Sequence, residues 1–207
     1  MTDEGVGHQY TLGAFRVHRS DSRVWVTHVQ APQRRLWSMD TLGASIRLGQ
    51  GQAAISESRG FFDVKEKTVA WVDGSPIRTV DESTDEVRLS GSLGATQHWM
   101  MEFFVHDDVQ LGLRVSSTDP EHNRLQLSFD REDEDDVFGF GEQFTQLNMK
   151  GKRVPVLSQE PGIGRGVQPL TWLMNTAFKA GGEWHNSNAP MPWFMTTGLQ
   201  GICLENH

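Results

Sequence analysis

Hydrophobic and polar residues alternate with a period of two along most of this 207-residue chain. Successive side chains of a strand point to opposite faces, so this alternation predicts strands with one buried face. The run RLQLSF at 124–129, in which every second residue is apolar, is an example. Strands are predicted over residues 15–31, 44–50, 68–74, 86–93, 98–107, 109–117, 123–132 and 153–158. Many short strands separated by turn residues predict an all-β fold, an antiparallel β-sandwich.

The last forty residues carry a different pattern. Residues 168–188 allow a short helix, with Leu170, Leu173 and Ala177 on one face, followed by a loop. Residues 192–207 predict a hairpin whose turn lies at 198–201 and whose last strand stops at His207. No linker or internal repeat divides the chain, so we expect a single domain over 1–207 that ends in mid-fold.

Composition narrows the class of protein. A hydrophobic content of 37% is too high for a disordered chain, and a net charge of −8 argues against nucleic acid as a partner. The single cysteine, Cys203, lies in the apolar run GICL and is expected to be buried and inert. No signal peptide and no membrane-spanning run is seen, which favours a cytoplasmic location without membrane contact. The charge run at 131–136 is expected to be a solvated turn.

Several kinds of chemistry lack the motif that they require. The run GIGRG departs from the spacing of a dinucleotide fingerprint, and Pro169 opposes direct entry into a helix. The eight histidines are scattered, so no metal site is predicted. Ser158 has no base near it in the sequence. We therefore expect no cofactor.

The stretch 137–166, VFGFGEQFTQLNMKGKRVPVLSQEPGIGRG, concentrates the remaining candidates in glycine-bounded turns. Glu142 and Glu160 could form a carboxylate pair for glycoside hydrolysis. The favoured alternative for Glu142 is structural, a carboxylate that accepts backbone N–H bonds within its turn. For Glu160 and Arg165, contact with a substrate and pairing within the loop remain equal alternatives.

Tryptophans form two groups. Trp25, Trp71 and Trp99 lie within strand patterns and are expected in the core. Trp184 and Trp193 lie near loops, where an aromatic ring can stack on the apolar face of a sugar. For Trp184, a ligand-facing position and a place at the edge of the core both remain open.

The stretch 137–166 also resembles the end of the N-terminal β-sandwich in family 31 of the glycoside hydrolases. The turn Phe138-Gly139-Phe140-Gly141-Glu142, the run 147–151 and the strand 154–157 carry this resemblance. Gln143 and the loop QEPGIGRG at 159–166 are similar to the bacterial sulfoquinovosidase branch, as is the later run at 180–206.

The resemblance implies a galactose-mutarotase-like sandwich that precedes a (β/α)8 barrel, which this chain lacks. The catalytic aspartates of the family lie on the barrel, so no catalytic residue is expected here, and the chain is expected to be an inactive fragment of a retaining α-glycosidase. Substrate-binding positions are expected at Gln159, Glu160, Arg165 and Trp184. Gly139, Gly141, Glu142 and Gln143 are expected to form a structural motif. The partners implied are a carbohydrate, an α-glycoside such as a sulfoquinovoside, and the barrel.

Two other functions remain open. A β-sandwich can act as a free-standing carbohydrate-binding module, and aldose epimerases share the sandwich architecture. Mutarotation requires a histidine acid and a glutamate base on the concave face of the sandwich, and no motif here places such a pair.

Overall fold

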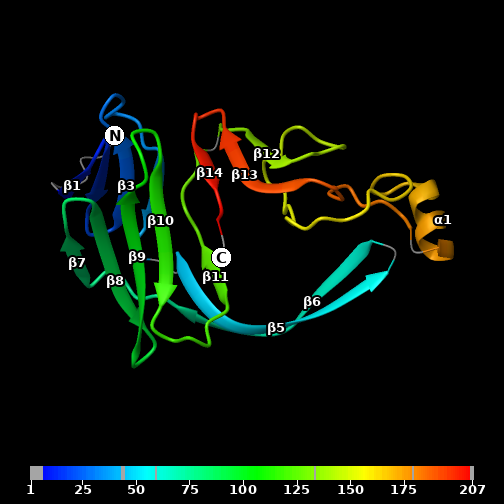
Figure 1. Ribbon diagram of the computed structural model, residues 1–207, viewed down its shortest axis with the longest axis horizontal. Coiled ribbons are helices and arrows are strands. Elements are labelled where there is room, and N and C mark those ends of the chain that lie inside the picture. Colours follow the sequence, from blue (N-terminus) through cyan, green and yellow to red (C-terminus); the bar gives the residue numbers. More distant parts are fainter. Residues whose placement is uncertain (1–6, 43–44, 59, 133, 179, 206–207) are drawn as a thin grey trace. The chain divides into compact units, whose positions relative to one another are not determined.

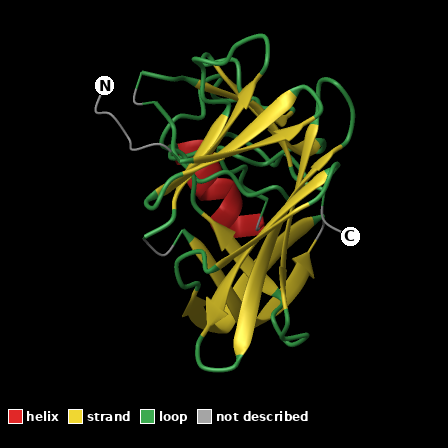
Figure 2. Cartoon of the chain, turned by 90° about the vertical axis from the view of Figure 1, so that its left-hand side faces the viewer, coloured by secondary structure: helices red, strands yellow, loops and turns green. Residues whose placement is uncertain are grey.

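The computed structural model is built from strands joined by turns and loops, with one helix in the described residues (Figures 1 and 2). It describes residues 7–42, 45–58, 60–132, 134–178 and 180–205. The elements, in chain order, are β1 (His8–Leu12), β2 (Phe15–Arg19), β3 (Arg23–His28), β4 (Trp37–Asp40), β5 (Ile46–Ser58), β6 (Phe61–Asp73), β7 (Thr79–Glu82), β8 (Glu86–Leu93), β9 (Gln97–Val105), β10 (Leu111–Ser117), β11 (Arg124–Leu127), β12 (Val137–Gly141), α1 (Pro169–Phe178), β13 (Pro190–Thr196) and β14 (Gly201–Cys203). The all-β class expected from the sequence is confirmed.

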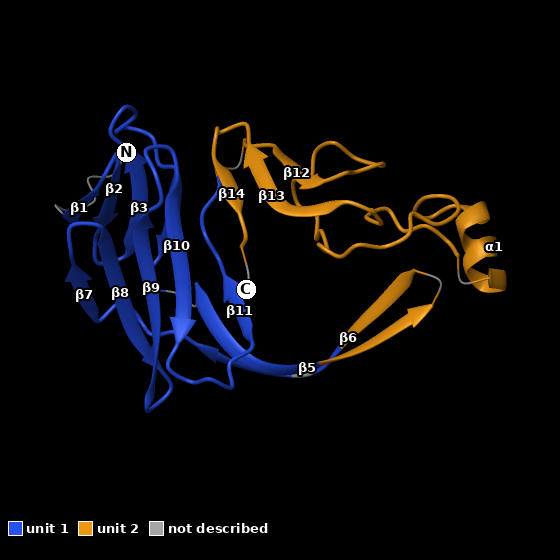
Figure 3. Cartoon of the chain, in the orientation of Figure 1, with its two compact units in different colours: residues 1–52, 66–131 blue, residues 53–65, 132–207 orange. Residues whose placement is uncertain are grey.

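The chain divides into two compact units, coloured separately in Figure 3. The first unit comprises Met1–Gln52 and Glu66–Arg131. The second unit comprises Ala53–Lys65 and Glu132–His207, and therefore includes the far end of the hairpin formed by β5 and β6.

The first unit contains two four-stranded antiparallel sheets, in the orders β1-β2-β3-β4 and β10-β9-β8-β7. Burial alternates strictly along β8, where Val87, Leu89, Gly91 and Leu93 are buried and every residue between them is half-buried. The rings of Trp37 and Phe103, one from each sheet, meet edge to face at 5.6 Å. The apolar faces of the two sheets therefore share one core.

The strand tryptophans differ in their burial. Trp99 is 2% exposed, and its indole N–H donates to the carbonyl of Ser75 at 3.1 Å. It lies across Gly91, where a Cβ would come within about 2.5 Å of the indole nitrogen. The core position expected for Trp25 and Trp71 is wrong, because both rings are only half-buried.

Arginines cover the rings of these two tryptophans. The guanidinium of Arg35 lies 5.3 Å from the centroid of the Trp25 ring, and that of Arg47 lies 5.4 Å from the Trp71 ring. His18 stacks on Trp25 at 5.0 Å with an interplanar angle of 4°. Alternation assigned these rings to the buried face, whereas each lies at a partly exposed face under a cation.

The second unit contains the three-stranded sheet β12-β13-β14 and the helix α1. The hairpin predicted over 192–207 is confirmed as β13 and β14, although its expected end at His207 lies outside the described residues, as does Ala44. The short helix is confirmed as α1. The strand predicted at 153–158 is not formed, because Pro155 lacks the N–H that a ladder requires and only Ser158 bridges to Ser187.

Two further expectations are corrected in the second unit. Cys203 is exposed on β14, not buried. The acidic run is not wholly solvated, because Asp135 is 7% exposed and its Oδ1 accepts a hydrogen bond from the Thr197 hydroxyl at 3.1 Å. Asp133 of that run lies outside the described residues. No helix among the described residues is long and apolar enough to cross a membrane.

Candidate functional site

The candidate site is a cluster of loops in the second unit, and its first part is a strained turn at the end of β12. Gly139, Phe140 and Gly141 have φ angles of 123°, 64° and 79°, and the register of β12 against β13 shifts between the two glycines. Left-handed backbone is unfavourable for phenylalanine, so the surroundings must hold it. The ring of Phe140 stacks on Phe194 of β13 at 5.3 Å, which supplies that support.

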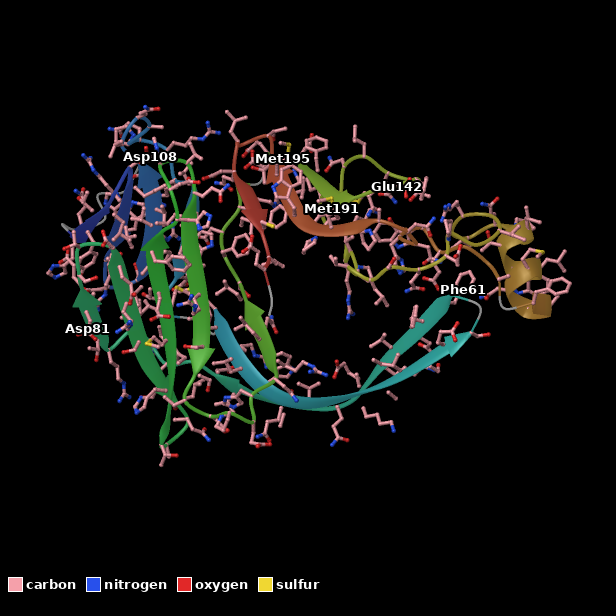
Figure 4. All side chains as sticks on the ribbon, in the orientation of Figure 1. Phe61, Asp81, Asp108, Glu142, Met191 and Met195 are labelled. Atoms are coloured by element: carbon pink, nitrogen blue, oxygen red, sulfur yellow. The ribbon has the colours of Figure 1, made fainter. Side chains whose placement is uncertain are left out.

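The side chains of Glu142 and Gln143, which follow this turn, have different surroundings. The side-chain amide of Gln143 donates to the carbonyl of Phe140 at 3.1 Å and closes the turn. The backbone N–H of Glu142 donates to the carbonyl of Ala189 at 3.0 Å. Within the described residues the Glu142 carboxylate accepts no hydrogen bond, and the residue is exposed (Figure 4).

The second part of the site is the loop 159–166, which is paired along its length with the segment 180–188. Backbone hydrogen bonds join Gln159 to Ser187 at 2.9 Å, Ile163 to Ala180 at 2.8 Å and Gly166 to Gly182 at 3.0 Å. These bonds fix the loop without the help of a regular sheet.

The loop 159–166 requires glycine where its backbone closely approaches the segment 180–188 and the helix α1. Gly162 has a φ of 69°, and a Cβ on it would lie 2.6 Å from Cα of Gly182. Gly164 has a φ of 75°, and a Cβ there would overlap the hydroxyl of Thr171 in α1. Side chains at these positions would force the two chain segments apart.

Arg165 is turned into the loop cluster. Its Nη1 donates to the carbonyl of Pro161 at 2.7 Å and to that of Asn186 at 3.4 Å. Its guanidinium also lies 4.7 Å from the centroid of the Phe144 ring. Arg165 is half-buried. Through these contacts its guanidinium connects the loop 159–166 with Phe144, which follows the strained turn.

Glu160 lies five positions before Arg165 in the sequence, and its carboxylate forms no ion pair with that arginine in the described residues. Its backbone N–H donates to the carbonyl of Gly60 at the tip of the β5–β6 hairpin at 3.2 Å, and its carbonyl accepts from the Asn186 side chain at 3.3 Å. Within the described residues no hydrogen bond or ion pair ends on its carboxylate, which is exposed. The Glu160–Arg165 pairing considered from the sequence is absent.

Trp184 borders both loops. Its backbone carbonyl accepts from the Thr145 hydroxyl at 2.5 Å, and its Cβ lies next to Gly166. The indole is half-buried and meets the ring of His185 edge to face at 5.4 Å.

An open depression of about 350 Å³ lies between the strained turn and the following loop. Gly139, Gly141, Gln143, Phe144, Thr145, Gln146 and Leu147 line it. No group of three histidine, cysteine, aspartate or glutamate residues in the described part of the chain is arranged to hold a metal ion.

Sequence reasoning missed two residues that build this site. Asn186 is 4% exposed and connects Glu160 with Arg165 through its side chain and its carbonyl. Phe144 provides the aromatic face for Arg165. The polar run HNSN, which contains Asn186, and the position of Phe144 directly after Gln143 can be seen in the sequence. Neither pattern indicates which residue it contacts in the fold.

The fold and this loop cluster form a β-rich unit, and the comparisons confirm that the chain resembles family 31 of the glycoside hydrolases. The chain is 28% identical over 196 residues to a sulfoquinovosidase of Escherichia coli (strain K12), covering 93% of this chain and 28% of that protein. It is 29% identical over 158 residues to a sulfoquinovosidase of Agrobacterium fabrum (strain C58), covering 76% of this chain and 23% of that protein.

A solved structure adds a likeness of fold. A family 31 sulfoquinovosidase from E. rectale, in complex with an aza-sugar inhibitor, superposes with a TM-score of 0.71 at 23% identity, covering 88% of this chain and 26% of that one. No protein-family model matches the chain. The chain spans 23% and 28% of the length of the two curated relatives.

Proposed function

We propose that this chain is the galactose-mutarotase-like β-sandwich of a retaining α-glycosidase, and that its loop cluster borders an active site whose catalytic carboxylates lie on a separate barrel domain. The favoured substrates are α-glycosides of sulfoquinovose. The similarity to the E. coli sulfoquinovosidase over 93% of the chain carries the proposal. It runs through both parts of the loop cluster, because a continuous match over 93% of the 207 residues cannot leave out 137–188.

The geometry of the loop cluster supports this role. A loop that borders an active site must hold its polar groups in fixed positions, because misplacement weakens transition-state binding. Here hydrogen bonds and glycine contacts fix the loop 159–166 against 180–188, where Glu160 is exposed and Gln159 and Trp184 are half-buried. These are the three side chains that we assign to contact with the sugar. Arg165 supports the loop from behind through Pro161 and Asn186.

The activity is tested with the product of the complete reading frame that contains this chain and with the 207-residue chain alone. Each is assayed on 4-nitrophenyl α-sulfoquinovoside and 4-nitrophenyl α-glucoside, and NMR follows the anomer released. We expect the complete protein to hydrolyse the sulfoquinovoside with retention and the chain alone to be inactive. Sugar binding or mutarotation by the chain alone, together with an inactive complete protein, would contradict the proposal.

The loop is tested separately by Arg165→Ala in the complete protein. Loss of the two hydrogen bonds and of the Phe144 contact frees the loop, so we expect a higher KM or a lower kcat, by about tenfold. Arg153→Ala removes an exposed arginine of the same unit and serves as the matched control. Equal kinetics of the two variants would rule out the role of the loop while leaving the family assignment intact.

A further inference from the structure

The outer face of the sheet β1-β2-β3-β4 carries cationic side chains around an aromatic ring. Arg16 and His18 of β2 lie directly opposite Thr27 and Trp25 of β3 in the register of the two strands. The residues between them in each strand are buried in the core, so these four side chains share the other face of the sheet. Arg35, from the loop before β4, lies over the Trp25 ring. We call these five residues the Arg16 patch.

The imidazole of His18 is held in place within the Arg16 patch. Its ring stacks on Trp25, and its Nε2 lies 2.9 Å from the Thr27 hydroxyl. The positive charges of Arg16 and Arg35 both act on this ring and oppose its protonation. The patch therefore brings three groups that can be cationic close to one another, and such groups repel unless an anion joins them.

The side chain of Arg16 has no partner in the described residues. Its Nε is buried and donates no hydrogen bond, and no ion pair ends on its guanidinium. Thr27, which lies opposite it, is only 2% exposed. A buried donor without an acceptor is rare in folded proteins, because nothing offsets the loss of its contact with water. Arg16 thus provides a charge and a donor for which the described residues offer no acceptor.

The carboxylates on the same face are engaged elsewhere. Asp40 lies opposite Arg23, which begins β3 at the end of that strand farthest from Thr27. The Oδ2 of Asp130 accepts from the Ser38 hydroxyl at 2.8 Å and lies 3.7 Å from Nε of Arg23. The acidic and the cationic groups of this face are therefore segregated along the sheet.

We propose that the Arg16 patch binds an oxyanion of the sulfate or phosphate type, either free or as an ester on a small molecule. The Nε–H and Nη–H groups of an arginine form a fork that fits two oxygens of such an anion. Arg35 supplies a second charge beside it. The site belongs to the first unit alone, so it stands or fails independently of the proposed function.

Binding of the anion is coupled to the charge of His18. A bound anion favours the protonated imidazole, and by linkage the protonated imidazole must strengthen anion binding by the same factor. The groups that face His18 are Gln9 of β1, Trp25 and Thr27 of β3 and the two arginines. None of these other groups titrates near neutral pH, so His18 alone sets the pH dependence of binding.

Histidine exchange in the complete protein tests the proposal. Hydrogen–deuterium exchange at Cε1 of each imidazole, followed by peptide mass spectrometry, gives the pKa of individual histidines. It is measured in sodium sulfate, in sodium methyl sulfate and in sodium chloride, all at equal ionic strength, so that general screening is the same. We expect sulfate to raise the pKa of His18 relative to chloride and to leave that of the exposed His98 unchanged. The same effect of methyl sulfate would extend the site to esters, and its absence would assign the site to the free anion.

The affinity for sulfate is measured by isothermal titration calorimetry at about pH 6, where His18 is partly protonated in the bound form. Arg16→Gln should weaken binding at least about tenfold, because it removes the charge and the fork together. Arg16→Lys keeps the charge without the fork and should fall between the two proteins. Arg78→Gln, which removes an exposed arginine of the same unit, is the matched control and should leave the affinity unchanged.

Two results would overturn the proposal. One is an equal pKa of His18 in sulfate and in chloride, and the other is an equal sulfate affinity of Arg16→Gln and Arg78→Gln. The exchange experiment uses the unmodified protein, so it decides the question even if Arg16→Gln does not fold.

Discussion

Gly162 and Gly151 have the same φ of 69° but different surroundings. A Cβ on Gly162 would meet Gly182 at 2.6 Å, whereas nothing lies within 4 Å of a Cβ on Gly151. Substitution of alanine at these two positions therefore separates the free-energy cost of a left-handed backbone from that of a steric clash.

We expect Gly151→Ala to cost about 1 kcal/mol, the usual penalty of left-handed backbone for alanine. Gly162→Ala adds a steric clash and should in addition break the bonds of Ile163 and Gly166, so that their amide hydrogens exchange about tenfold faster or more. Hydrogen exchange by NMR measures both variants. Equal exchange rates in the two would show that the loop is not held by this close approach.

His18 is a titratable residue that is partly buried and lies near two arginines. Burial lowers the pKa of His18 below its usual 6.5, and the nearby charges of Arg16 and Arg35 lower it further. Its Nε2 lies 2.9 Å from the Thr27 hydroxyl. The folded chain consequently binds this proton less readily than the unfolded chain does.

This pKa gives a stability prediction with a definite sign. Above pH 6.5 His18 is neutral in both the folded and the unfolded state, so its protonation does not reduce the free energy of unfolding. As the pH falls from 6.5 toward the lower pKa of the folded state, only the unfolded state takes up the proton, and the free energy of unfolding decreases. His18→Gln should reduce this slope in urea unfolding experiments between pH 7 and 5. The same substitution at the exposed His98 is the control, and an unchanged slope in His18→Gln would contradict the assignment.

At the scale of elements, an ion cluster crosses three neighbouring strands. Arg88 of β8, Glu102 of β9 and Arg114 of β10 lie opposite one another in the registers of the sheet. Glu102 is 6% exposed, and its two carboxylate oxygens accept from Arg88 at 2.8 Å and from Arg114 at 3.4 Å. The hydrogen bond with Glu102 raises the pKa of Arg88.

Glu102→Gln removes the charge that separates the two arginines. Because the neutral amide leaves the two guanidinium groups, which lie on either side of β9, without their shared counterion, we expect Tm to fall by roughly 3 to 8 °C, more at low salt than at high salt. The Arg47–Asp73 pair, which is more exposed, provides the control through Asp73→Asn. A Tm that is insensitive to Glu102→Gln would mean that the cluster contributes nothing.

Elements with a strong local signal were predictable, and those fixed by distant contacts were not. The strand β8 was predicted with its observed bounds, because the apolar residues Val87, Leu89 and Leu93 and the small Gly91 occupy every second position. The strand β5 continues to Ser58 through polar residues, where hydrophobic alternation is weak. The helix α1 was predicted, but the side that it buries is set by the packing of Thr171 against Gly164, a contact that the helical pattern does not disclose.

The site shows the same division. Positive φ angles at Gly139 and Gly141 were foreseeable from the glycines themselves. The contacts of Arg165 with Phe144 and Asn186 join residues 21 positions apart along the chain, and only folding reveals them. Cys203 follows the same rule, because the apolar run GICL does not disclose that β14 exposes it.

At the scale of the whole molecule, the buried apolar side chains are concentrated in one unit. The first unit contains the hydrophobic core. In the described residues of the second unit only one apolar side chain, Met149, is buried, so the structure of that unit depends mainly on hydrogen bonds. Hydrogen bonds alone hold a segment weakly against local opening.

Limited proteolysis of the 207-residue chain should therefore cut within 132–207 before it cuts within 66–131. The expected product, identified by mass spectrometry, is a resistant fragment that ends close to Arg131. In the complete protein we expect the same bonds to be cut more slowly. Simultaneous cleavage of both segments would contradict a difference in stability between the units.

The stack of His18 on Trp25 also has an optical consequence. Two rings 5.0 Å apart and nearly parallel are close enough for a protonated imidazole to quench the emission of the indole. The fluorescence of Trp25 should therefore decrease as His18 takes up its proton. Subtracting the emission of the His18→Gln variant isolates this signal, so that the protein carries its own reporter of the charge on a single histidine.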